Sequence, residues 1–173
     1  MFILTYWLIP AEPARSHFAS LIGNLAARFD APVFEPHVTI YTAPLGNENA
    51  AGLLDRVLTN RGTYRLLVSG VDYADEFTKT VFVQFQPDEA LTQLSADLRQ
   101  ASTMKSDEDI NPHLSLIYKT LPRETKDEIA RSVSMPFDEV RFDSAKAVIS
   151  PADIKSRADV EAWRVVATQR LKE

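Results

Sequence analysis

Apolar and polar residues follow two different periods along the chain, which predict a mixture of strands and amphipathic helices. The segment 2–9 is almost wholly apolar and stops at Pro10, as a buried first strand would. A helix is predicted over 11–29, with Pro13 acceptable in its first turn. Its apolar residues fall at helical spacing: Phe18, Leu21, Ile22, Leu25 and Phe29.

The rest of the chain continues this alternation of strands and helices. Further strands are predicted over 36–42, 63–74, 80–86, 112–118, 136–150 and 161–171, and helices near 48–59, 87–102 and 121–133. A β-bulge is expected at Gly70 and a hairpin connection over 75–79. Strands 36–42 and 112–118 each lie between two helices, which predicts two similar lobes facing one another rather than a parallel βαβ sheet. No linker divides the chain, so we expect one bilobal α+β domain over residues 1–173.

Composition and charge exclude several classes of function. The chain of 173 residues has no cysteine, which removes disulfides and thiol chemistry and suggests a reducing, cytoplasmic setting. The formal charge of −5 without a basic block argues against binding to duplex nucleic acid, while a small anionic ligand stays compatible. The apolar start is too short for a membrane span and lacks a signal peptide's basic region. Five scattered glycines supply neither GxGxxG nor a P-loop.

One five-residue pattern occurs twice and contains two of the three histidines. It reads Pro-His-apolar-hydroxyl-apolar at 36–40 and again at 112–116. Because side chains alternate along a strand, His37 and Thr39 share one face while the apolar residues between them anchor the other. His113 and Ser115 are arranged in the same way. If the lobes are related by a pseudo-twofold axis, the two polar pairs meet across a cleft. The third histidine, His17, is interpreted as a packing or solvent-edge residue of the first helix.

Two imidazoles and two hydroxyls suit the cleavage of a phosphodiester without a metal. In-line displacement at phosphorus needs a base on the attacking oxygen and an acid on the leaving oxygen, and histidine can take either role near neutral pH. Hydroxyl donors aimed at the non-bridging oxygens stabilise the charge of the transition state. Metal catalysis is the weaker alternative, because two histidines and no cysteine leave a metal site short of ligands.

At these residues the chain resembles the 2H phosphoesterase superfamily, and within it the small cyclic phosphodiesterases. The paired motifs in "FEPHVTIY" and "NPHLSLIYKTL" carry the resemblance, supported by "YWLIP", "TVFVQFQPDEAL" and "VEAWRVVA". The resemblance implies two pseudo-symmetric antiparallel-sheet lobes with outer helices and a central cleft. It also implies metal-independent, cofactor-free hydrolysis of a 2′,3′-cyclic nucleotide or of ADP-ribose 1″,2″-cyclic phosphate. His37 and His113 would then act as acid and base, and Thr39 and Ser115 would hold the phosphate.

The same resemblance suggests a set of ligand-contacting positions: Trp7, Phe77, Lys79 and Tyr118. Strict alternation would instead place Tyr118 on the core side of its strand, so both interpretations stay open. Lys79 stands where the nearest relatives lead us to expect glutamine, and a solvated hairpin lysine is its alternative interpretation. Trp163 alternates with Val165 and Ala167 and is predicted to be a core residue.

Three functional hypotheses follow. The first is hydrolysis of a small cyclic nucleotide by a monomer that has no contact with membranes. The second is the same chemistry on an RNA 3′ end, either opening of terminal 2′,3′-cyclic phosphates or 2′-5′ RNA ligase-like activity. The third is a binding module that senses a cyclic phosphate without cleaving it, which the filled His and hydroxyl positions of both motifs disfavour.

Overall fold

The computed structural model describes residues 1–173 and places strands and helices close to the predicted segments. The strands are β1 (Phe2–Pro10), β2 (Val38–Pro44), β3 (Tyr64–Tyr73), β4 (Val81–Phe85), β5 (His113–Ile117), β6 (Glu139–Pro151) and β7 (Arg164–Arg170). The helices are α1 (Ala14–Phe29), α2 (Ala50–Leu58), α3 (Glu89–Ala101), α4 (Arg123–Ser132) and α5 (Arg157–Glu161), with a 3₁₀ turn η1 (Phe77–Lys79). Helix α5 was not predicted, because five residues are too few to show a helical period.

All seven strands join one antiparallel sheet that closes on itself. The order is β1-β2-β5-β4-β3-β6-β7, and β1 also pairs with β6, so six strands form a ring. The long strand β6 pairs with β1 along one edge, and with β3 and then β7 along the other. Opposite β6, the ring is joined by a single residue pair between Val38 of β2 and Leu114 of β5. The two motif strands therefore meet where the sheet is most narrowly connected.

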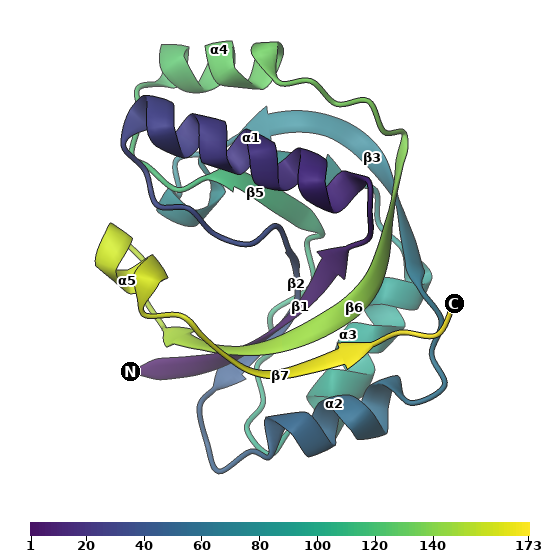
Figure 1. Ribbon diagram of the computed structural model, residues 1–173. Coiled ribbons are helices and arrows are strands. Elements are labelled where there is room, and N and C mark those ends of the chain that lie inside the picture. The colour runs from purple at the N-terminus through teal and green to yellow at the C-terminus, as the bar shows by residue number, and fades with distance from the viewer.

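Helices cover the two halves of this sheet, which form the two lobes (Figure 1). Helices α2 and α3 pack on the half made by β1, β2, β6 and β7, whereas α1 and α4 pack on β3, β4 and β5. Helix α1 lies between β1 and β2 in the sequence, yet it packs against β5 of the other lobe. The lobes are therefore interleaved in sequence rather than being consecutive halves of the chain, and each carries one motif strand.

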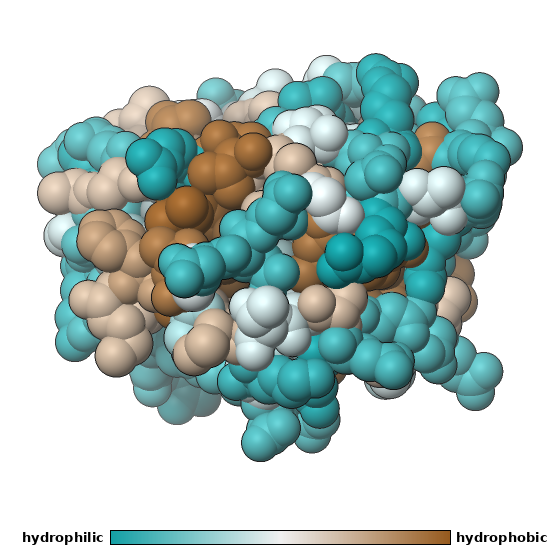
Figure 2. Space-filling model, turned by 90° about the horizontal axis from the view of Figure 1, so that it is seen from below, coloured by the Kyte–Doolittle hydropathy of each residue, from teal (hydrophilic) through white to brown (hydrophobic).

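One cluster of 33 buried residues draws on both lobes. It includes the apolar residues of the repeated motif, Val38, Ile40, Leu114 and Leu116, as strand alternation predicts. The bulge expected at Gly70 is confirmed by a register shift between Val68 and Gly70 in the β3–β4 pairing. On the face seen in Figure 2, polar side chains interrupt the apolar groups. None of the helices combines the length and apolar character needed to cross a bilayer.

Candidate active site

The His37 imidazole is fixed by the chain segment just before β2. The strand begins at Val38, two residues later than predicted, and the residues before it have no regular secondary structure. Nδ1 of His37 lies 2.7 Å from that carbonyl oxygen. A carbonyl can only accept a hydrogen bond, so Nδ1 carries the proton of the neutral ring and Nε2 is left as a free acceptor.

His113 is held in the same way in the other lobe. Its Nδ1 lies 2.8 Å from the carbonyl oxygen of Asn111, again two residues earlier. In both motifs a proline separates the carbonyl from the histidine, and a proline restricts the preceding residue to an extended backbone. The repeated Pro-His pair thus gives both rings one tautomer, with Nε2 available for proton transfer.

The single pairing of Val38 with Leu114 brings the polar residues of the two motifs together. Because the strands run antiparallel, His37 lies on the Ser115 side of this pair and Thr39 on the His113 side. The charge of His113 is close enough to act on His37, whose pKa it lowers. Four side chains from two lobes therefore share one region of the molecule.

His37 lies in an aromatic environment. Its ring stacks on Trp7 with 3.7 Å between ring centroids, and Trp163 and Phe34 approach it edge-on at 5.8 and 6.2 Å. Only 7% of His37 is exposed. Burial lowers the pKa of His37 from 6.5 to about 4, although the hydrogen bond to the Glu35 carbonyl and the charge of Glu35 act in the opposite direction. The ring is therefore neutral at pH 7 in the free protein.

His113 is less deeply placed and has different neighbours. Burial again lowers its pKa, helped by the charge of Lys79 and opposed by that of Glu76. Nζ of Lys79 lies 4.6 Å from the ring centroid of Phe82, whose edge in turn meets His113 at 5.6 Å. The structure thus places Lys79 near His113, and neither residue is among those that line the cleft beside His37.

The two hydroxyls of the motifs differ in their hydrogen bonding. Ser115 is buried, and its Oγ donates to the carbonyl oxygen of Thr78 at 2.6 Å. Thr39 is half-buried on the cleft wall, and its hydroxyl has no hydrogen-bond partner within the protein. Thr39 can donate to a ligand directly, whereas Ser115 must first turn away from Thr78.

A cleft of about 770 Å³ opens in front of His37 and Thr39. Its aromatic wall contains Trp7, Phe77, Tyr118 and Trp163. Tyr118 combines both interpretations left open by the sequence. It is 4% exposed and stacks on Phe34 with 4.0 Å between centroids, yet it also lines the cleft, because it follows the last residue of β5.

Trp163 was wrongly predicted to be a core residue. Strand β7 begins only at Arg164, and Val165, with which Trp163 was expected to alternate, is itself 47% exposed. The indole is half-buried at the cleft and meets Trp7 and Tyr118 edge-on at 5.2 and 5.7 Å. Phe34 was missed altogether, although an aromatic residue three positions before His37 could have suggested it. No three His, Asp or Glu side chains come close enough together to hold a metal ion.

Two antiparallel lobes that each contribute a His-x-Thr/Ser strand define the 2H class of phosphoesterases. The chain belongs to the cyclic phosphodiesterase-like protein family of this class, whose model matches residues 1–171. A cyclic phosphodiesterase of Arabidopsis thaliana is 24% identical over 173 residues, covering 98% of this chain and 95% of that protein.

Solved structures support the same fold. The protein TT0787 of Thermus thermophilus superposes with a TM-score of 0.63 at 18% identity, covering 98% of each chain. LigT of E. coli in complex with 3′-AMP gives 0.59 at 14% identity, again over 98% of each chain. The expected bilobal α+β fold is thereby confirmed, and the protein is an enzyme of the 2H cyclic phosphodiesterase type.

Proposed function

We propose that the protein hydrolyses a small cyclic phosphodiester, a 2′,3′-cyclic nucleotide or ADP-ribose 1″,2″-cyclic phosphate, to an acyclic phosphomonoester without a metal. The observation that carries the proposal is the matched anchoring of the two rings. Both histidines give Nδ1 to a main-chain carbonyl two residues earlier and keep Nε2 free for the substrate. One ring can then remove a proton while the other supplies one.

In the proposed mechanism His37 is the base and His113 the acid. The deeper burial of His37 keeps its Nε2 unprotonated at neutral pH, as a base requires. Nε2 of His37 takes a proton from water as the water oxygen bonds to phosphorus. The bond from phosphorus to one ring oxygen breaks, and protonated His113 gives its Nε2 proton to that oxygen. The negative phosphate raises the pKa of His113 and so favours its protonated form before reaction.

Thr39 and Ser115 are proposed to bind the non-bridging oxygens. The Thr39 hydroxyl faces the cleft without a partner, and the Ser115 hydroxyl can exchange its bond with Thr78 for one to the phosphate. Trp7, Tyr118 and Phe77 offer aromatic faces on which a base or ribose can rest. Lys79 is proposed to act through its charge on His113 instead of through a contact with the base.

The test is hydrolysis of 2′,3′-cyclic AMP in excess EDTA. We expect turnover by the wild type and its loss in His37→Ala and in His113→Ala. His17→Ala is the matched control, because His17 lies on α1 and bonds the Ser134 carbonyl. The product, a 2′- or a 3′-phosphate, identifies the leaving oxygen. Loss of wild-type activity in EDTA would contradict the metal-free mechanism, and tight binding of the nucleotide without turnover would favour the binding module.

Action on RNA 3′ ends is the second candidate, and the charge of the cleft weighs against a long RNA. Three carboxylates and two lysines line it: Glu76, Glu108, Asp153, Lys105 and Lys155. Such a lining offers no continuous positive track for successive phosphates, though a terminal nucleotide still fits. Salt separates the two substrates, because RNA binding weakens steeply as salt rises and turnover of a mononucleotide changes much less.

A further inference from the structure

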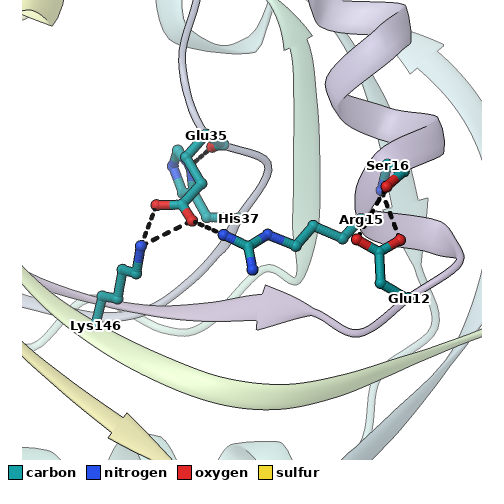
Figure 3. A network of polar contacts seen from close by, with 6 residues as sticks. All are labelled: Glu12, Arg15, Ser16, Glu35, His37 and Lys146. Carbon is teal, nitrogen blue, oxygen red and sulfur yellow. Dashed lines mark hydrogen bonds and ion pairs between the residues drawn. The ribbon is translucent and has the colours of Figure 1, made fainter.

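The carboxylate of Glu35 lies at the centre of an ionic cluster next to His37 (Figure 3). Nζ of Lys146 donates to both of its oxygens, at 2.8 Å and 2.6 Å, and the guanidinium of Arg15 donates at 2.9 Å. The three side chains come from the segment before β2, from β6 and from α1. The cluster therefore ties the segment that carries His37 to both lobes.

The main chain of Glu35 holds the His37 ring directly. Its carbonyl oxygen is the acceptor for Nδ1 of His37, so any movement of Glu35 moves the partner of the imidazole. Lys146 is the strand neighbour of Trp7 in the β1–β6 pairing, and Trp7 stacks on the His37 ring. The ion pair thus links Glu35, whose carbonyl orients the His37 ring, to strand β6, which pairs with β1 at Trp7.

In the second motif, the residue that holds the histidine ring is supported by a neutral side chain instead of an ion pair. Asn111 supplies the carbonyl for His113, and its side-chain oxygen accepts from Nε2 of Gln84 at 2.9 Å. Gln84 is the strand neighbour of His113 in the β4–β5 pairing. The corresponding positions thus hold a neutral amide pair beside His113 and an ion pair beside His37. Orientation alone does not require charge at Glu35.

We propose that Glu35 is a positioning residue for His37, because its carbonyl holds the ring and its carboxylate, paired with Lys146 and Arg15, fixes the segment that carries the ring. Lys146 and Glu35 side chains are only 18% and 23% exposed, so solvent screens this pair less than a surface pair. Its effect on turnover rests on the proposed function, whereas its effect on the His37 ring does not.

Other ionisable groups also surround His37. His113 faces it from β5, and Glu76 and Lys79 lie beside His113. The remaining charged groups of the cleft are Lys105, Glu108, Asp153 and Lys155. The charge of Glu35 raises the pKa of His37, and that of His113 lowers it. Removing Lys146 and Glu35, the two members of the partly buried ion pair, one at a time should therefore move the pKa of His37 in opposite directions.

The experiment is an NMR titration of the His37 ring in the wild type, Lys146→Met and Glu35→Gln, with turnover of 2′,3′-cyclic AMP measured alongside. In Lys146→Met the uncompensated carboxylate should raise the pKa of His37 by about half a unit or more. In Glu35→Gln the uncompensated ammonium should lower it, and kcat should fall roughly tenfold with a smaller change in KM. Arg15→Met should act like Lys146→Met but more weakly, because Arg15 is half exposed.

Glu139→Gln is the matched control. Glu139 also accepts from an arginine, Arg65 at 2.8 Å, but on the β3–β6 pair and outside the cleft lining. It should leave both the titration and the turnover unchanged. Shifts in the same direction for Lys146→Met and Glu35→Gln, or no shift in either, would overturn the proposal. If Glu35→Gln does not fold, the upward shift in Lys146→Met and Arg15→Met decides it. A wild type that cleaves no cyclic phosphate would refute the proposed function while the titration still tests Glu35.

Discussion

Replacing His37 by a residue that does not titrate should change how the stability of the protein depends on pH. The pKa of His37 is about 4 in the folded protein and 6.5 in an unfolded chain. Above pH 6.5, His37 is neutral in both the folded and the unfolded chain, so the free energy of unfolding does not depend on its titration. As the pH falls from 6.5 toward 4, His37 binds a proton in the unfolded chain but not in the folded one, and this lowers the free energy of unfolding. Since each pKa unit corresponds to about 1.4 kcal/mol, His37 should remove about 3 kcal/mol of folding free energy across this interval.

Urea denaturation of the wild type and of His37→Gln, at several values of pH between 7.5 and 4, measures this contribution. The free energy of unfolding of the wild type minus that of the variant should be constant above pH 6.5 and fall by about 3 kcal/mol toward pH 4. His113→Gln should show a change of the same sign and smaller size, because burial also lowers the pKa of His113. A difference that is flat with pH, or one that rises on acidification, would refute the claim that burial keeps His37 neutral.

Three further predictions concern the site and its support. Ser115→Ala should lower kcat/KM for 2′,3′-cyclic AMP by about 100-fold if its hydroxyl binds the transition state, and a loss of less than about threefold would contradict this role. Phe34→Ala should cost about 3 kcal/mol in urea denaturation, because Phe34 is 7% exposed and stacked on Tyr118. The half-buried Phe77 should cost less when replaced by alanine. In a pH profile, wild-type kcat/KM should fall as the pH drops toward about 4, since protonation removes the base.

The elements and the motif faces could be predicted because both depend on short-range pattern. Apolar runs predicted the strands. Alternation within Pro-His-apolar-hydroxyl-apolar correctly predicted that the apolar residues of both motifs, such as Val38 and Leu114, belong to the hydrophobic core. Alternation was a poorer guide at the ends of strands. Trp163 precedes the first residue of β7 and lies at the cleft, whereas Tyr118 follows the last residue of β5 and is buried, as alternation predicts, yet also lines the cleft.

The supports of the site could not be predicted, because they depend on which strands and helices become neighbours. Lys146 reaches Glu35 only because β6 pairs with β1 next to Trp7. Arg15 reaches it from α1, which packs against β5 of the other lobe. The segment 31–37 has no regular secondary structure and no hydrophobic period, so its pattern did not mark Glu35 as part of the site.

A repeated sequence motif does not by itself imply repeated chemistry. Both histidines keep the same tautomer through the same kind of carbonyl, and this much follows from the local Pro-His sequence. Their proton affinities depend on burial and on the charges nearby. Burial lowers the pKa of both rings and acts more strongly on His37, the charge of Glu35 raises the pKa of His37, and the charge of Lys79 lowers that of His113. In a hydrolysis with one base and one acid, the ring of lower proton affinity is the one more often unprotonated at neutral pH, as the base must be. The similar backbone therefore orients the two rings alike, and the proposed roles of His37 as base and His113 as acid depend on the different surroundings of the two rings.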